Sequence, residues 1–146
     1  MRRVKGLVAV AVPVLWVFAA ACGGDEAEVN VTLSEFIVEP DPATVDAGEV
    51  TFVADNQGSE THEFLVVEAA SADELPVDDD GAFDEGAFEE DALLGEVEDV
   101  TAGSEQELTL DLEAGTYVLL CNIVEEEDGE AESHFAEGMH ATFTVE

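Results

Sequence analysis

The stretch that decides the fold lies at the C-terminal end of the chain. It reads GTYVLLCN at residues 115–122, then an acidic segment, then SHFAEGMHATFTV at residues 133–145. Residues 116–122 are apolar on both faces, which predicts a buried strand, and the alternation over residues 139–145 predicts the last strand. We therefore expect two strands here, joined by a loop that carries Cys, His and Met.

Side-chain alternation predicts which residues near this loop face the interior. Met139 shares its parity with the apolar Phe143, whereas His140 shares its parity with threonines. We therefore expect Met139 to point inward and His140 outward. Upstream, His62 shares its parity with Phe64 and is also expected to point inward.

The rest of the chain shows many short segments in which apolar and polar residues alternate, separated by turns that contain Gly, Pro, Asn or Asp. This rhythm predicts an all-β fold, a β-sandwich, with no internal repeat. The further expected strands cover residues 29–33, 36–38, 44–45, 50–54, 62–68 and 105–112.

A long acidic insertion at residues 71–100 interrupts this rhythm and carries 13 acidic side chains. One short helix can form within it at residues 84–94, where acidic residues near the start suit the helix dipole. Residues 78–81 (DDDG) offer hard oxygen ligands of the kind that calcium prefers. The full calcium-loop pattern is absent, so a solvated acidic excursion is the favoured interpretation.

Four side chains stand out as candidate metal ligands: His62, Cys121, His134 and Met139. Two imidazoles, one thiolate and one weak thioether form the ligand set of a mononuclear blue-copper site. Almost nothing else in the chain offers comparable chemistry, because the only other cysteine, Cys22, ends an apolar leader.

Each of these residues has a plainer interpretation. Cys121 could be a buried structural cysteine or pair with Cys22 in an oxidising compartment. His62 could be a satisfied core histidine and Met139 an ordinary core residue. Zinc could occupy one Cys and two His, although a thioether is a poor zinc ligand. His140 could serve as a substitute axial or exposed ligand.

The C-terminal stretch, together with VTFVADNQGSETHEF at residues 50–64, resembles the cupredoxins over roughly residues 29–146. The resemblance implies a Greek-key β-sandwich that binds one copper ion, Cu(I)/Cu(II), through His62, Cys121, His134 and Met139. It also implies a type 1 (blue) copper protein that carries single electrons between redox partner proteins and is not an enzyme. The alternative is a copper-binding carrier protein without an electron-transfer role.

The chain departs from the family pattern at two places. Twelve residues separate Cys121 from His134, where the family usually has only a few. Glu63 follows the first histidine, where the family often has an Asn that steadies the copper loop. The extra acidic residues at 125–132 predict either a docking face for a basic redox partner or a salt-adapted surface.

The N-terminus predicts export. Basic residues at positions 2–5 and an apolar run at 6–21 are typical of a signal peptide, here residues 1–21. Small residues directly before Cys22 resemble a lipidation motif, so we expect a lipid anchor at Cys22, a tether at 22–28 and a location on the outer face of the cytoplasmic membrane. The alternative is an ordinary signal peptide that leaves Cys22 unmodified.

Charge narrows the choice of partners. The chain has 37 acidic residues, and its three Lys and Arg residues all lie in the expected signal peptide. A mature chain without Lys or Arg repels nucleic acid and anionic lipid surfaces. Such acidity favours adaptation to a salty medium, where the Debye length is about 3 Å at 1 M salt, and steering toward a cationic partner is the other explanation.

The charge leads to a first prediction. Folding concentrates like charges that the unfolded chain spreads apart, and salt screens their repulsion. The melting temperature of the metal-free mature protein should therefore rise strongly as NaCl is increased from 0.1 to 1 M. A melting temperature that stays flat or falls with salt would show that the acidic surface is not a net destabilising contribution.

Overall fold

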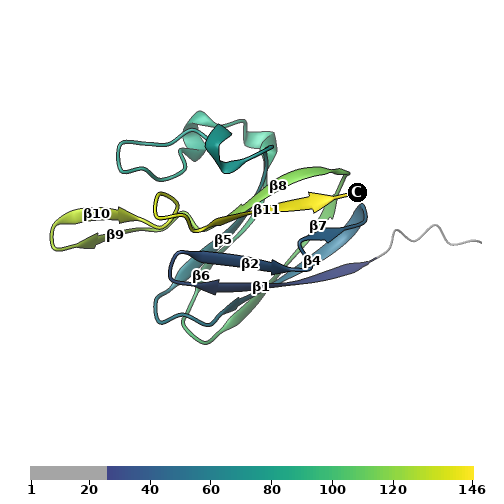
Figure 1. Cartoon of the computed structure of the whole chain (residues 1–146), viewed down its shortest axis with the longest axis horizontal. Helices are drawn as coiled ribbons and strands as arrows, with labels where there is room; N and C mark the ends of the chain where they lie inside the picture. Colours follow the sequence, from purple (N-terminus) through teal and green to yellow (C-terminus); the bar gives the residue numbers. More distant parts are fainter. Residues whose placement is uncertain (1–25) are drawn as a thin grey trace, which may run out of the picture.

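Two β-sheets form the body of the protein in the computed structural model, which describes residues 26–146 (Figure 1). The first sheet has the order β2-β1-β4-β7, the second has the order β3-β11-β8-β5-β6, and a separate hairpin pairs β9 with β10. The strands are β1 (Ala27–Ser34), β2 (Ile37–Asp41), β3 (Thr44–Val45), β4 (Gly48–Asn56), β5 (His62–Glu68), β6 (Leu93–Val100), β7 (Glu105–Leu112), β8 (Gly115–Leu120), β9 (Val124–Glu127), β10 (Glu130–Ser133) and β11 (His140–Val145). Three 3-10 turns lie between β5 and β6: η1 (Ala72–Glu74), η2 (Glu85–Ala87) and η3 (Glu90–Ala92).

From β2 to β8 the chain crosses to the other sheet at every connection except that between β5 and β6, so neighbours within a sheet are mostly distant in sequence. β1 pairs with β4 and β3 pairs with β11 in parallel, whereas the other pairings are antiparallel. The all-β sandwich expected from the sequence is confirmed. The residues between Cys121 and His134, which exceed the usual family length, form the β9-β10 hairpin that projects from one end of the body (Figure 1).

Apolar side chains from both sheets meet in one core. The ring of Phe52 on β4 lies 5.6 Å from that of Phe64 on β5 and 5.2 Å from that of Phe143 on β11, measured between centroids. All three rings are fully buried. Full burial of such a side chain contributes roughly 1.5–3 kcal/mol to stability, so these rings tie the two sheets together.

The outer face of the second sheet is covered as well. Leu65 and Val67 alternate with the core residues of β5 and are fully buried on its other side. They pack in a second cluster that includes Leu75, Phe83 and Phe135. The acidic insertion is therefore only partly solvated, because its apolar residues cover the face of a sheet.

The insertion does not form the one short helix expected at residues 84–94. Two separate 3-10 turns, η2 and η3, take its place, and Asp84 caps η2 by accepting a hydrogen bond from the backbone N–H of Ala87 at 3.1 Å. Leu93 then begins β6 and pairs with Val67 of β5. Strand pairing with a buried neighbour outweighs the weak local preference for helix. Residues 93–100 thus belong to the sandwich.

The acidic turn at residues 78–81 is organised by one carboxylate. Oδ1 of Asp78 accepts hydrogen bonds from the backbone N–H groups of Asp80 and Ala82, both at 3.0 Å. Side-chain capping of this kind is typical of Asp in turns. The Asp78 carboxylate therefore stabilises the turn itself.

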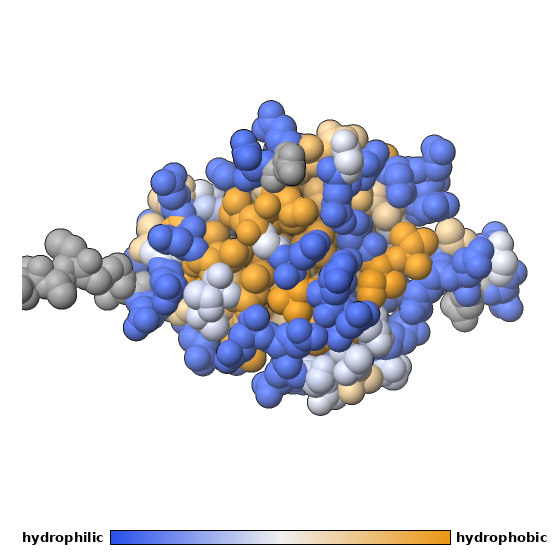
Figure 2. All heavy atoms as spheres, turned by 180° about the vertical axis from the view of Figure 1, so that it is seen from behind, coloured by the Kyte–Doolittle hydropathy of each residue, from blue (hydrophilic) through white to orange (hydrophobic). Residues whose placement is uncertain are grey.

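Hydrophilic and apolar side chains are distributed unevenly over the surface. Seen from behind, apolar side chains gather in the middle of the face and hydrophilic ones surround them (Figure 2).

Within residues 26–146, no helix has the length and apolar character needed to span a membrane. The expected signal peptide and Cys22 lie outside the described residues.

Candidate metal centre

Three separate segments bring the predicted ligands to one end of the sandwich. His62 opens β5, Cys121 directly follows β8, and His134 and Met139 belong to the loop between β10 and β11. Donor atoms of His62, Cys121 and His134 all lie within 4.8 Å of one another. All four side chains are fully buried.

The unpaired polar atoms of this cluster fit a bound metal ion. Sγ of Cys121 lies 3.5 Å from Nδ1 of His134, and Cys121 carries a free thiol. Both ring nitrogens of His62 are buried and have no hydrogen-bond partner among the described residues. Buried polar atoms are normally paired, so nitrogens left unpaired beside a thiol are suited to coordinate a soft or borderline metal.

Backbone hydrogen bonds fix the ligand loop. The N–H of Met139 donates to the carbonyl of His134 at 2.9 Å, and the N–H of Cys121 donates to the carbonyl of Met139 at 3.0 Å. Gly138 has a φ of +98°, in a region that only glycine adopts readily. The Gly that precedes Met139 is therefore needed to turn the chain back toward Cys121.

Protonation of the donors depends on their burial. Burial raises the pKa of the Cys121 thiol to about 11. Burial first, and then the nearby His134, lower the pKa of His62. At neutral pH the imidazole of His62 is therefore neutral and able to coordinate, whereas a metal ion has to displace the proton of Cys121. Such displacement makes metal affinity fall as pH falls.

Asn56 steadies the loop before the first histidine, a role that sequence reasoning missed. Its side-chain amide donates to the carbonyls of Glu60 and Val100, both at 2.7 Å, and its oxygen accepts from the N–H of Gly58 at 2.9 Å. Glu63, at the family's Asn position, instead donates its backbone N–H to Sγ of Cys121 at 3.4 Å. The sequence offered only an Asn in the polar turn after the strand expected at residues 50–54, and its burial is seen only in the structure.

The Glu63 side chain lies in a partly buried, acidic environment. Burial first, and then the charges of Glu85, Glu96 and Glu98, raise the pKa of Glu63 to about 7. Of the other sequence candidates, His140 is exposed and its ring lies 5.2 Å from that of Phe135. His140 is not part of the buried cluster.

Glu35 clamps the same loop from the opposite side. Its Oε1 accepts hydrogen bonds from the N–H of Ser59 at 2.6 Å, from the Ser59 hydroxyl at 2.9 Å and from the N–H of Glu60 at 3.2 Å. These bonds, chiefly those from Ser59, lower the pKa of Glu35 to about 2. A Cβ at Gly58 would lie 2.8 Å from that oxygen, so only glycine leaves room for the clamp.

Comparison with known proteins places the chain in a family. The family model described as a cupredoxin-like domain matches residues 6–130, so the chain belongs to the cupredoxin-like family. The match includes His62 and Cys121 and ends before His134 and Met139. No curated protein sequence matches the chain.

Solved structures share the fold. Reduced auracyanin from the photosynthetic bacterium Roseiflexus castenholzii is 19% identical with a TM-score of 0.55, covering 85% of this chain and 98% of its own. Auracyanin A, a "blue" copper protein from Chloroflexus aurantiacus, is 18% identical with a TM-score of 0.54, covering 84% and 100%. Rusticyanin from Thiobacillus ferrooxidans is 19% identical with a TM-score of 0.53, covering 84% and 79%.

The Glu35 clamp gives the second prediction. Glu35→Gln should lower the melting temperature of the metal-free protein relative to Glu39→Gln, which removes one exposed charge from β2. Because the pKa of Glu35 is lowered on folding, its stabilisation is fully present above its ordinary pKa of 4.5 and is lost as pH falls toward 2. Thermal melts of both variants between pH 7 and pH 2 measure this difference, and equal melting temperatures at pH 7 would contradict it.

Proposed function

We propose that the protein is a type 1 (blue) copper protein that carries single electrons between redox partners outside the cytoplasmic membrane. The observation that carries this proposal is the buried cluster of His62, Cys121 and His134, whose donor atoms lie within 4.8 Å of one another beside Met139. Copper is the proposed cofactor, one ion held by these four side chains. The named neighbours auracyanin A and rusticyanin are copper proteins, which supports the assignment.

The four side chains suit an ion that changes oxidation state with little movement. Bound copper would supply one-electron cycling between Cu(I) and Cu(II). The two imidazoles coordinate either state, the thiolate provides strong electronic coupling, and a thioether gives only a weak axial contact. The strands and loop hydrogen bonds hold these donors in place before the metal binds, which keeps rearrangement small.

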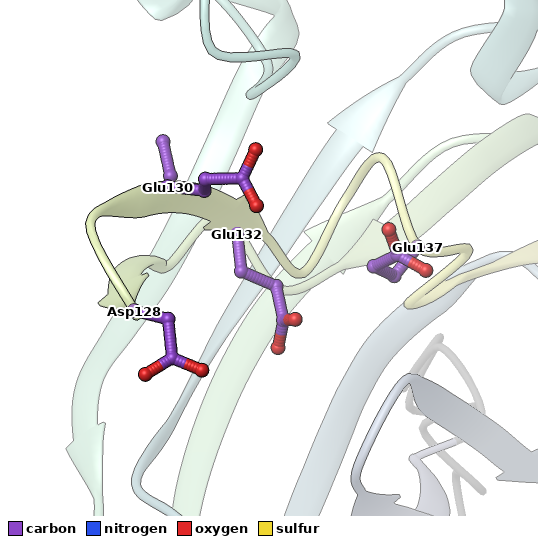
Figure 3. A pocket seen from close by; sticks show the side chains of 5 residues that line it. Asp128, Glu130, Glu132 and Glu137 are labelled. Carbon is purple, nitrogen blue, oxygen red and sulfur yellow. The ribbon is translucent and has the colours of Figure 1, made fainter.

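The surface of the hairpin beside the ligand loop is acidic, so a basic redox partner is the proposed docking partner. Asp128, Glu130, Glu132 and Glu137 line a hollow between the β9-β10 hairpin and the ligand loop (Figure 3). No Lys or Arg occurs anywhere in residues 26–146 to neutralise them. Complementary charge mainly speeds encounter and selects partners. The same acidity disfavours nucleic acid as a partner.

A second candidate function is copper capture or delivery without an electron-transfer role, since the same ligands would hold Cu(I). A reversible potential and fast electron self-exchange would favour the electron carrier, whereas tight Cu(I) retention with little redox activity would favour the copper carrier. An enzyme is not proposed, because four protein ligands leave no open position for a substrate.

The metal assignment gives the third prediction. One equivalent of Cu(II) should produce an intense visible thiolate-to-copper absorption band, and Cys121→Ser should abolish it because the sulfur donor is lost. Met139→Leu should keep the band and raise the reduction potential, because a donor to Cu(II) is removed. An anaerobic copper titration with visible spectroscopy and voltammetry measures both effects.

The matched control is His140→Gln, which removes the exposed histidine next to Met139 and should leave the band and the potential unchanged. A Cys121→Ser protein that remains blue would show that the ligand assignment is wrong. A protein that stays colourless and retains zinc in place of copper would contradict the proposed function.

We also propose the domain organisation and anchoring that the sequence predicts. Residues 1–21 form a signal peptide, Cys22 is lipidated, and a short tether leads to the copper domain. The tether expected at 22–28 ends earlier than the sequence predicts, and the domain expected at 29–146 begins earlier, because Ala27 and Glu28 already pair with β4 as part of β1. The support is the sequence pattern of basic residues, an apolar run and small residues directly before Cys22. A lipid anchor at Cys22 would place the copper domain on the outer face of the cytoplasmic membrane.

The anchor gives the fourth prediction. The wild-type chain should sediment with membranes, whereas Cys22→Ala should remain unprocessed or be released. A single acyl chain binds a membrane only marginally, so stable anchoring requires the several chains of a lipidated N-terminal cysteine. Membrane fractionation and mass spectrometry of the mature N-terminus measure this. A mature chain that begins beyond residue 22 would contradict it.

A further inference from the structure

The imidazole of His134 faces a different set of donors on each side. Its Nδ1 lies 3.5 Å from Sγ of Cys121, within the buried cluster. Its Nε2 points the other way and lies 3.9 Å from Oε2 of Glu60 and 3.9 Å from Oε2 of Glu125. These three outer donors also lie within 4.8 Å of one another. They form a second cluster that shares only the His134 ring with the first.

The outer nitrogen of His134 lacks a partner. The side chain is 0% exposed, and Nε2 has no hydrogen-bond partner among the described residues. A separation of 3.9 Å is too long for a hydrogen bond to either carboxylate. A buried polar atom left unpaired is costly, so a ligand that bonds this nitrogen would relieve the cost.

The two carboxylates are positioned by separate parts of the fold. The loop that carries Glu60 is held by the Glu35 clamp on its N–H and by the Asn56 amide on its carbonyl. Glu125 lies on β9, where it pairs with Glu132 of β10. Two segments far apart in sequence therefore bring negative charge to one buried nitrogen, and no Lys or Arg of residues 26–146 is present to balance it.

We propose that Nε2 of His134 and the carboxylates of Glu60 and Glu125 form a second metal site, for a divalent cation of the Zn²⁺ class. Zinc binds one imidazole nitrogen and two carboxylate oxygens at 2.0–2.2 Å, which places donors of a tetrahedral shell roughly 3.3–3.6 Å apart. The two N···O separations of 3.9 Å need to shorten by about half an ångström, and the two carboxylate oxygens lie within 4.8 Å of each other. Glu60 and Glu125 are 42% and 45% exposed, so water can complete the shell.

The site would couple cation binding to the copper centre, and in that respect the inference rests on the proposed function. Copper would be held on the Nδ1 side of the ring and zinc on the Nε2 side, so both sites would use the His134 imidazole. Any proton displaced from Nε2 by zinc would leave to solvent through the exposed carboxylates. The ring of Phe36 packs edge-on against His134 with centroids 5.6 Å apart, which keeps the imidazole oriented toward both sides.

The test uses copper-loaded protein and zinc alone as the probe. Equilibrium dialysis against Zn²⁺ in 0.5 M NaCl screens weak binding to the general acidic surface. We expect one Zn²⁺ per chain, with affinity lowered at least about tenfold by Glu60→Gln and by Glu125→Gln. Glu126→Gln is the matched control, because it removes the neighbouring exposed charge of the same strand, and it should bind zinc like the wild type.

A spectroscopic readout tests whether the two sites share the His134 ring. Zinc at a concentration that just saturates the wild type should shift the visible copper band of the wild type and of Glu126→Gln, and shift the band of Glu60→Gln and Glu125→Gln much less. Zinc binding that is equal in all variants, or absent in 0.5 M NaCl, would overturn the proposal. Zinc binding that depends on both carboxylates but leaves the wild-type band unmoved would overturn the role of His134. Absence of any blue band before zinc is added would refute the proposed function instead, and the dialysis would still report on the outer carboxylates.

Discussion

The structure depends on the burial of two imidazoles and a thiol at one end of the sandwich, where three of the four ring nitrogens have no hydrogen-bond partner among the described residues. Leaving such groups unpaired costs free energy in an apolar interior. The rest of the fold opposes this cost: three aromatic rings join the sheets, and the backbone bonds of Cys121 and Met139 hold the ligand loop closed. A metal ion would convert the cost into binding energy, so metal affinity and stability of this end are linked.

Charge is the second constraint on the molecule. With no Lys or Arg in residues 26–146, carboxylates can be balanced only by hydrogen-bond donors, protons or external cations. Glu35 uses donors, since three hydrogen bonds from one loop hold it ionised. Glu60 and Glu125 use none through their side chains among the described residues and face the unpaired Nε2 of His134 instead. Individual carboxylates of the acidic surface therefore have specific structural roles, in addition to the general repulsion among like charges.

The acidic insertion shows where local sequence signals are insufficient. Its many carboxylates predict a solvent-exposed segment, and its few apolar residues predict a short helix. In the structure, Phe83 and Leu75 instead cover the outer face of the second sheet. Leu93 joins β6 because Val67 offers a paired edge there. These outcomes depend on a sheet built from strands distant in sequence, which no window of a few residues contains.

The sequence by itself determined the sandwich, the four ligand candidates and the direction in which Met139 and His140 point, because alternation along a strand is a local property. Only the tertiary structure decided how the loop before His62 is held, since Asn56 reaches Val100 of β6 and Glu35, in the turn after β1, reaches Ser59 of that loop. It also decided that both nitrogens of His134 face donor groups. That arrangement needs Glu60, Cys121 and Glu125 to meet around one ring, and only the folding of the chain brings them together.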